Sequence, residues 1–182
     1  MRDTTFDNSD ASVAAPYLSS GAETLENMKE ARSTLLDQTG PVALMAHSQS
    51  LPLRWVLGDS RPNSIRSIVA LEPKKAPFIN TIFPPDTPAH PLGVTETPLA
   101  YDPPISSPNY LNLVVASNSS LFTYYRQDEP AHKLVNLMKI SIFIVTSKTS
   151  YRAIYDGCTV DYFKQVGVRV DHINLGDVET NT

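Results

Sequence analysis

The chain has 182 residues, of which 41% are hydrophobic, which is enough for one globular domain with an ordinary core. Its net charge of −4 and its lack of Lys/Arg clusters argue against nucleic acid as a partner. The single cysteine, Cys158, excludes an internal disulfide framework and favours a reducing compartment, so we predict a cytoplasmic location. No apolar run reaches the roughly 20 residues of a membrane span, so no membrane partner is expected.

Residues 1–20 are polar and lack periodicity, which predicts a poorly ordered segment before a domain that covers residues 21–182. From residue 22 to residue 38, apolar side chains recur at spacings of three and four, and Gly40 follows as a stop signal. This pattern predicts an amphipathic helix that packs on a sheet.

Residues 40–73 read as one βαβ unit: a strand at 42–45, a tight turn, a helix and a second strand at 65–71. The short apolar runs are typical of a parallel sheet covered on both faces. Ligands and chemistry collect at the carboxyl ends of parallel strands. Ser48 and Glu72 both fall at such ends.

The turn approximates the nucleophile elbow Gly-x-Ser-x-Gly, in which a strained strand-to-helix turn exposes a serine hydroxyl. The two glycine positions hold Ala46 and Ser50, which are small enough to fit with added strain. We therefore predict Ser48 as a nucleophile and the backbone N–H of Gln49 as an oxyanion-hole donor. The alternative is an ordinary polar turn between a strand and a helix.

Ten prolines between residues 72 and 108 exclude regular helix and central strand there. An insertion at this point would lie over the pocket mouth, so we predict a proline-rich cap or loop at residues 73–108. Its large apolar residues would line an acyl or polyketide pocket or form the cap's own small core; they are Phe78, Ile79, Ile82, Phe83, Leu92 and Tyr101.

The rest of the chain predicts a helix at 127–138, a strand at 140–146, a helix at 159–165 and a last strand at 168–175. Alternating helices and strands continue the parallel-sheet pattern. The fold class is therefore α/β, with a mostly parallel sheet flanked by helices.

Several segments resemble the α/β-hydrolase superfamily, and more closely a group of bacterial and fungal hydrolases related to an unusual bacterial esterase. They are ARSTLLDQTGPVALMAHSQ, AHSQS, IVALEP, LGVTETPLAYDPP and YDGCTVDYFKQVGVRVDHINL. The resemblance implies a partial α/β-hydrolase fold and a serine esterase in which Glu72, after the strand that follows the nucleophile helix, is the acid. Because many fungal members lie beside secondary-metabolite genes, it also suggests a tailoring role in such a pathway.

A serine hydrolase also needs an imidazole base, which this superfamily carries after its last strand. Residues 176–182 contain no histidine, and no strand-loop unit for the oxyanion hole precedes residue 22, so the chain looks truncated at both ends. His47 adjoins Ser48 and should point away from it, His90 lies in the cap, His132 is expected to be solvated, and His172 lies within a strand. A second hypothesis is therefore a catalytically silent relative that acts as a binding remnant or has no activity.

The histidines are scattered and there is no paired Cys or phosphate loop, so no metal or cofactor is expected. The predicted partner is a small-molecule ester or carbonyl compound. Sheet edges left open by missing strands also predict a homodimer.

Overall fold

The computed structural model describes residues 21–80, 87–118 and 122–176. The predicted poorly ordered segment 1–20 and two of the predicted cap residues, Ile82 and Phe83, lie outside this description.

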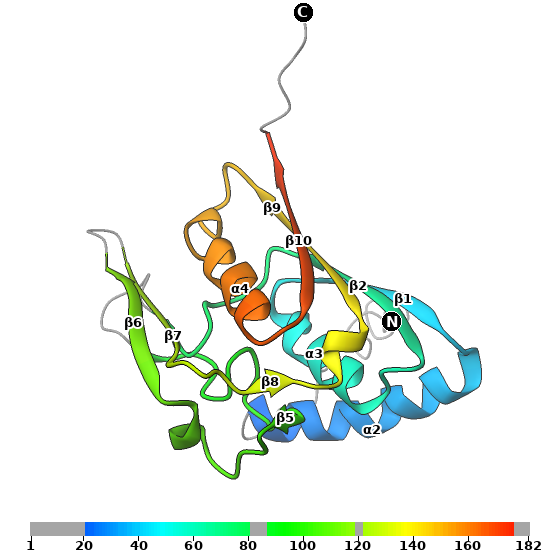
Figure 1. Cartoon of the computed structure of the whole chain (residues 1–182). Helices are drawn as coiled ribbons and strands as arrows, with labels where there is room; N and C mark the ends of the chain where they lie inside the picture. The colour runs from blue at the N-terminus through cyan, green and yellow to red at the C-terminus, as the bar shows by residue number, and fades with distance from the viewer. Residues whose placement is uncertain (1–20, 81–86, 119–121, 177–182) are drawn as a thin grey trace, which may run out of the picture.

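In the part of the chain that the structure describes, four parallel strands form the central sheet, in the spatial order β1-β2-β9-β10 (Figure 1). The strands are β1 (Val42–His47), β2 (Ile65–Leu71), β9 (Ser141–Ser147) and β10 (Arg169–Leu175). They coincide closely with the apolar runs of the sequence. The predicted α/β class and parallel sheet are confirmed.

Within the described ranges, three α-helices accompany the sheet: α2 (Gly21–Thr39), α3 (Leu51–Ser60) and α4 (Ala153–Gln165). Helix α3 contacts β1 and β2, α4 contacts β9 and β10, and α2 packs on α3 (Figure 1). Proline at the start of α3 is tolerated because the first helical N–H groups have no intrahelical acceptor. Helix α4 begins earlier than predicted, and this brings Asp156 into its first turn.

The two faces of the sheet are covered unequally. Fully buried Ile68, Ala70, Ile142 and Ile144 alternate along their strands with half-buried residues. The strand register places Met45, Val69 and Phe143 in one row of the second face and Leu71, Val145 and Ile173 in the next. Met45 is 66% exposed and Ile173 46%. The expected burial of both faces is therefore wrong for the described residues.

Between β2 and β9 lies a long insertion of short elements. They are β3 (Ile79–Asn80), β4 (Thr87–Pro88), β5 (Tyr101–Asp102), η2 (Pro108–Leu111), β6 (Leu113–Asn118), β7 (Thr123–Gln127), β8 (Lys133–Leu134) and η3 (Leu137–Lys139). The antiparallel pair β6 and β7 projects from the body at the left of Figure 1.

The predicted helix at 127–138 is wrong. Pro130 lacks the N–H that a helix interior needs and disfavours a helical conformation at the residue before it. The Gln127 side chain closes this loop instead, because it accepts the N–H of His132 at 2.9 Å and donates to the His132 carbonyl at 3.3 Å.

The proline-rich segment joins the main core. Phe78, Leu92 and Tyr101 are 2%, 5% and 5% exposed. The Tyr101 hydroxyl donates to the Leu92 carbonyl at 2.9 Å, so the Tyr162 hydroxyl of α4, 2.6 Å away, donates to Tyr101. Phe78 stacks edge-on against Tyr162 and also lines, with Ile79, a hollow of about 560 Å³.

Candidate active site

Ser48 stands directly after β1, in the left-handed backbone region with φ of 57°. A residue with a Cβ is strained there, as the nucleophile-elbow pattern anticipates. The two small residues at the glycine positions are accommodated: Ala46 is 6% exposed, and the Ser50 hydroxyl folds back to donate to the His47 carbonyl at 2.8 Å. Gln49 follows Ser48 in the short 3₁₀ turn Ser48–Ser50 that leads into α3.

Glu72 stands at the equivalent point after β2 and is also left-handed, with φ of 47°. Its Oε1 accepts the backbone N–H of Ser147 at 3.2 Å, and its Oε2 accepts from Arg152 Nη1 at 3.1 Å. Burial works to raise the pKa of Glu72, but the hydrogen bonds from Ser147, Ser150 and Arg152 outweigh it. The pKa therefore lies below its ordinary value, and the carboxylate is ionised at neutral pH.

Arg152 joins the two predicted residues. Its Nη2 donates to Ser48 Oγ at 2.7 Å while Nη1 binds Glu72, and the side chain is 12% exposed. Burial works to lower the pKa of Arg152, but Tyr155, Tyr151 and Glu72 outweigh it, so the pKa is raised. A guanidinium has no acceptor and keeps its proton in proteins, so Arg152 cannot be the general base.

No local pattern in the sequence indicated Arg152. It lies 104 positions from Ser48 and 80 from Glu72 along the chain. The one available clue was its place shortly after the carboxyl end of a central strand.

None of the four histidines is shown bonded to Ser48 within the described part of the chain. His47 Nε2 comes within 4.0 Å of Glu72 Oε2 and its side chain is 62% exposed. His132 is half-buried, and its Nδ1 donates to the Pro103 carbonyl at 2.6 Å.

His90 is buried in the proline-rich segment. Its Nε2 lies 3.2 Å from the Lys74 carbonyl, so Nε2 carries the proton and donates. Burial lowers the pKa of His90 to about 4; the hydrogen bond to the Lys74 carbonyl works to raise it, and the charges of Lys75 and Lys74 work to lower it. This side chain is held by backbone as a neutral ring.

A separate chain of side-chain hydrogen bonds links α4, β9 and β10. The Thr146 hydroxyl donates to Asp156 Oδ2 at 2.6 Å and lies 2.9 Å from His172 Nε2, which must then donate to it. Asp156 is fully buried, and burial raises its pKa to about 7. Burial lowers the pKa of His172. The predicted position of His172 within a strand is confirmed, and its ring is committed to Thr146.

A surface hollow of about 610 Å³ opens beside Ser48. It is lined by His47, Ser48, Gln49, Ser50, Lys74, Tyr151 and Arg152. Within the described ranges, no cluster of three His, Cys, Asp or Glu side chains is arranged to hold a metal ion, and no helix is long and apolar enough to cross a bilayer.

Comparison with known proteins sets this geometry in context. No protein-family model matches the chain. Over 156 residues, which are 84% of the chain, it is 36% identical to "Probable secreted lipase phiG" of Fungal sp. (strain ATCC 74256). The chain is therefore a sequence relative of a protein named as a lipase. It spans 42% of that relative's length.

Among solved structures, the chain is similar to a novel bacterial esterase, with a TM-score of 0.43 and 14% identity over 81% of this chain and 32% of that one. The name of the curated relative contradicts the predicted cytoplasmic location, because a secreted lipase points to the extracellular space. The inference from one cysteine failed because a protein can leave the cell without any disulfide.

Proposed function

We propose that this chain carries the nucleophile and the acid of a serine esterase, with Ser48 attacking an ester carbonyl and Glu72 orienting the base. The observation that carries the proposal is the shared contact: Ser48 Oγ and the Glu72 carboxylate both bind the guanidinium of Arg152. Two groups bridged by one planar cation are also close enough to be bridged by one imidazole.

In the proposed chemistry, an imidazole takes the Ser48 hydroxyl proton as Oγ bonds to the carbonyl carbon, and it later returns the proton to the leaving alcohol. Glu72 would hold the other ring nitrogen and stabilise the imidazolium. The Gln49 backbone N–H would donate to the developing oxyanion. Arg152 occupies the place of this imidazole in the structure, so the base must displace it.

The substrate we propose is a small-molecule ester. The related secreted lipase supports an ester and an extracellular site of action. A tailoring role in secondary metabolism belongs to the same proposal and rests on the family resemblance.

A second candidate is a catalytically silent relative that binds a ligand and does not turn it over. Arg152 favours it, because a guanidinium between Ser48 and Glu72 leaves the serine without a proton acceptor. The two candidates differ in the reactivity of Ser48.

Labelling with a fluorophosphonate, read by intact mass, separates them. In this reaction the Ser48 Oγ–P bond forms, fluoride leaves and the hydroxyl proton passes to the base. Labelling of the folded chain, absent from Ser48→Ala and from the urea-unfolded chain, is the result expected of the esterase. No labelling in a chain that unfolds cooperatively would leave the silent relative.

An Arg152→Ala variant sharpens this experiment, because it opens the space between Ser48 and Glu72. Added imidazole should then raise the labelling rate of Arg152→Ala and leave Arg152→Ala/Ser48→Ala unlabelled. An unchanged rate would mean that this space does not accept a base.

A further inference from the structure

The hollow beside Ser48 has an uneven charge. Two basic side chains, Lys74 and Arg152, line it, while none of its described lining residues is a carboxylate. The chain as a whole carries a net charge of −4. A local excess of positive charge on an acidic protein attracts anions to that place.

Glu72 offsets only part of this charge. It is 21% exposed, and its two oxygens accept from Ser147 and from Arg152 Nη1. One carboxylate therefore faces two cations, and Lys74, which is exposed, is shown in no ion pair with it. The site keeps a net positive charge at neutral pH.

Arg152 is held in a fixed orientation. Its guanidinium carbon lies 5.0 Å from the centre of the Tyr151 ring, and its Nη atoms are directed by Glu72 and Ser48. Each Nη has two hydrogens; the bonds to Glu72 and Ser48 use one on each, and Tyr155 is a further side-chain hydrogen-bond partner, so at least one Nη donor remains for a ligand oxygen. A hydrogen bond from a preoriented guanidinium to a carboxylate is charge-assisted and stronger than one between neutral groups.

We propose that this hollow binds the carboxylate of a small organic acid, with Arg152 as the preoriented donor and Lys74 as the second cation. The substrate class is then an ester that also carries a free carboxylate. Only this naming of the substrate rests on the proposed function, because carboxylate binding does not require Ser48 to react.

Succinate and its uncharged dimethyl ester form a matched pair of probes. Titration of the ¹⁵N-labelled chain should move the amide resonances of Gln49, Ser50 and Arg152 with succinate and leave them in place with the dimethyl ester. Raising the ionic strength should weaken the succinate effect.

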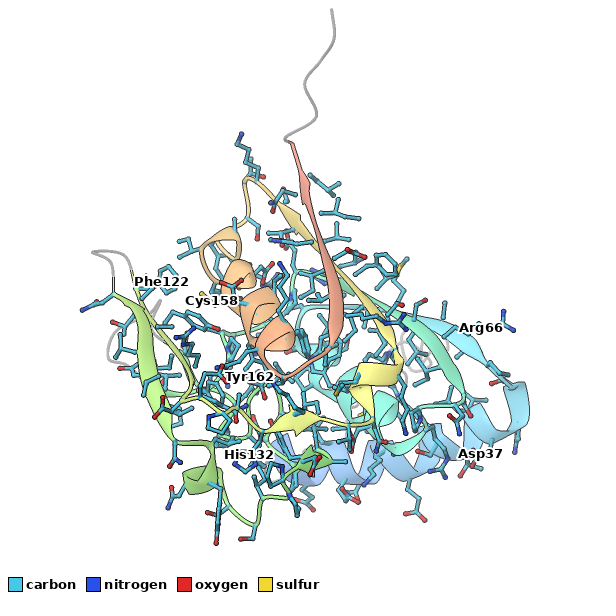
Figure 2. All side chains as sticks on the ribbon, in the orientation of Figure 1. Asp37, Arg66, Phe122, His132, Cys158 and Tyr162 are labelled. Carbon is cyan, nitrogen blue, oxygen red and sulfur yellow. The ribbon has the colours of Figure 1, made fainter. Side chains whose placement is uncertain are left out.

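Three variants test the assignment. Arg152→Gln should weaken succinate binding about tenfold or more, and Lys74→Gln about threefold, since an exposed charge is better screened. Arg66→Gln removes the same charge from the amino end of β2, and Arg66 projects away from α4 in Figure 2, so it should bind succinate as the parent does.

Lys74→Gln keeps the test decisive if Arg152→Gln unfolds. Equal affinity of Lys74→Gln and the parent, or equal shifts with succinate and its dimethyl ester, would overturn the proposal. This outcome can be told apart from that of phosphonate labelling. Labelling without succinate binding would support the esterase proposal and overturn the carboxylate site. Succinate binding without labelling would support the carboxylate site and contradict the esterase proposal.

Discussion

Ser48 and Glu72, which directly follow β1 and β2, both adopt a backbone conformation that is unfavourable for residues with a Cβ. Their φ values of 57° and 47° lie where a Cβ crowds the backbone. Such strain at functional positions is maintained by the surrounding structure. Here the β1–β2 ladder and the contacts of Arg152 provide that support.

Comparing Ser48→Gly with Ser48→Ala isolates the strain, because both variants lose the hydrogen bond from Arg152. Ser48→Gly should be more stable than Ser48→Ala by about 1 kcal/mol, since glycine accepts positive φ freely. Urea unfolding of the two variants measures the difference. Equal midpoints and slopes would show that residue 48 is unstrained.

Asp156 is a buried carboxyl that the proposed chemistry does not use. Its pKa of about 7, against an ordinary 3.8, means that the folded chain keeps a proton that the unfolded chain releases. Stability should therefore fall as pH rises between about 4 and 7, by up to about 4 kcal/mol, and then level off. The groups that affect this carboxyl are Thr146, Glu72 and Arg152.

Asp156→Asn should remove this pH dependence, because an amide of the same shape still pairs with Thr146 and does not ionise. The variant should be as stable as the parent near pH 4 and more stable at pH 8. Urea unfolding at both pH values gives the parent-minus-variant difference, in which the other titrating groups cancel. A difference that does not change with pH would place the Asp156 pKa at its ordinary value.

At the scale of elements, Gly93 allows the proline-rich segment to pack closely against Tyr162 of α4. It has φ of 93°, and a Cβ built on it would lie 2.1 Å from the Tyr162 hydroxyl oxygen. The tyrosine pair of Tyr101 and Tyr162 therefore fits only against a glycine. Figure 2 shows Tyr162 within the body of the molecule, on α4.

Gly93→Ala should destabilise the chain by about 3 kcal/mol, from the clash and the disfavoured φ together. Gly157→Ala is the matched control, since its Cβ would meet nothing within 4 Å and it lies inside α4. There alanine should add about 1 kcal/mol. Urea unfolding decides the signs, and a stable Gly93→Ala would mean that the segment is loosely docked.

The elements that the sequence predicted well are those with local signals. The apolar runs at 65–71 and 140–146 are buried strands, and residues 22–38 form the helix that their spacing indicates. Local signals failed at residues 127–138. A helix was predicted there, but the Gln127 side chain closes a loop by hydrogen bonding to the backbone of His132. Arg152 shows the same for the site, since only the folded sheet brings it to Ser48 and Glu72.

At the scale of the whole molecule, the less covered face of the sheet is the main exposed apolar surface among the described strands. Met45, Ile173 and Leu175 are 66%, 46% and 52% exposed there. Strand β10 also ends the sheet as described, with an unpaired edge. Exposed apolar faces and open strand edges promote association. The homodimer remains a prediction, and this face of the sheet is the surface at which it can be tested.

The double variant Met45→Lys/Ile173→Lys should reduce self-association of the purified chain, because it places charge on both edge strands of this face. Ile154→Lys is the control, since Ile154 is 38% exposed on α4. Sedimentation velocity over a range of concentrations measures the effect. A parent chain that stays monomeric, or a control as monomeric as the double variant, would contradict the prediction.

The pairing of β1 with β2 also sets which features of this site can vary. His47 pairs with Leu71 as the last rung of their ladder, and Ser48 and Glu72 are the next residues. Their backbones are thus held at about the interstrand spacing of 4.8 Å, whatever the length of α3 or of the loop at residues 61–64. Insertions there would change the count of residues between nucleophile and acid without moving either one. Homologues of this site are therefore better recognised by strand register than by sequence spacing.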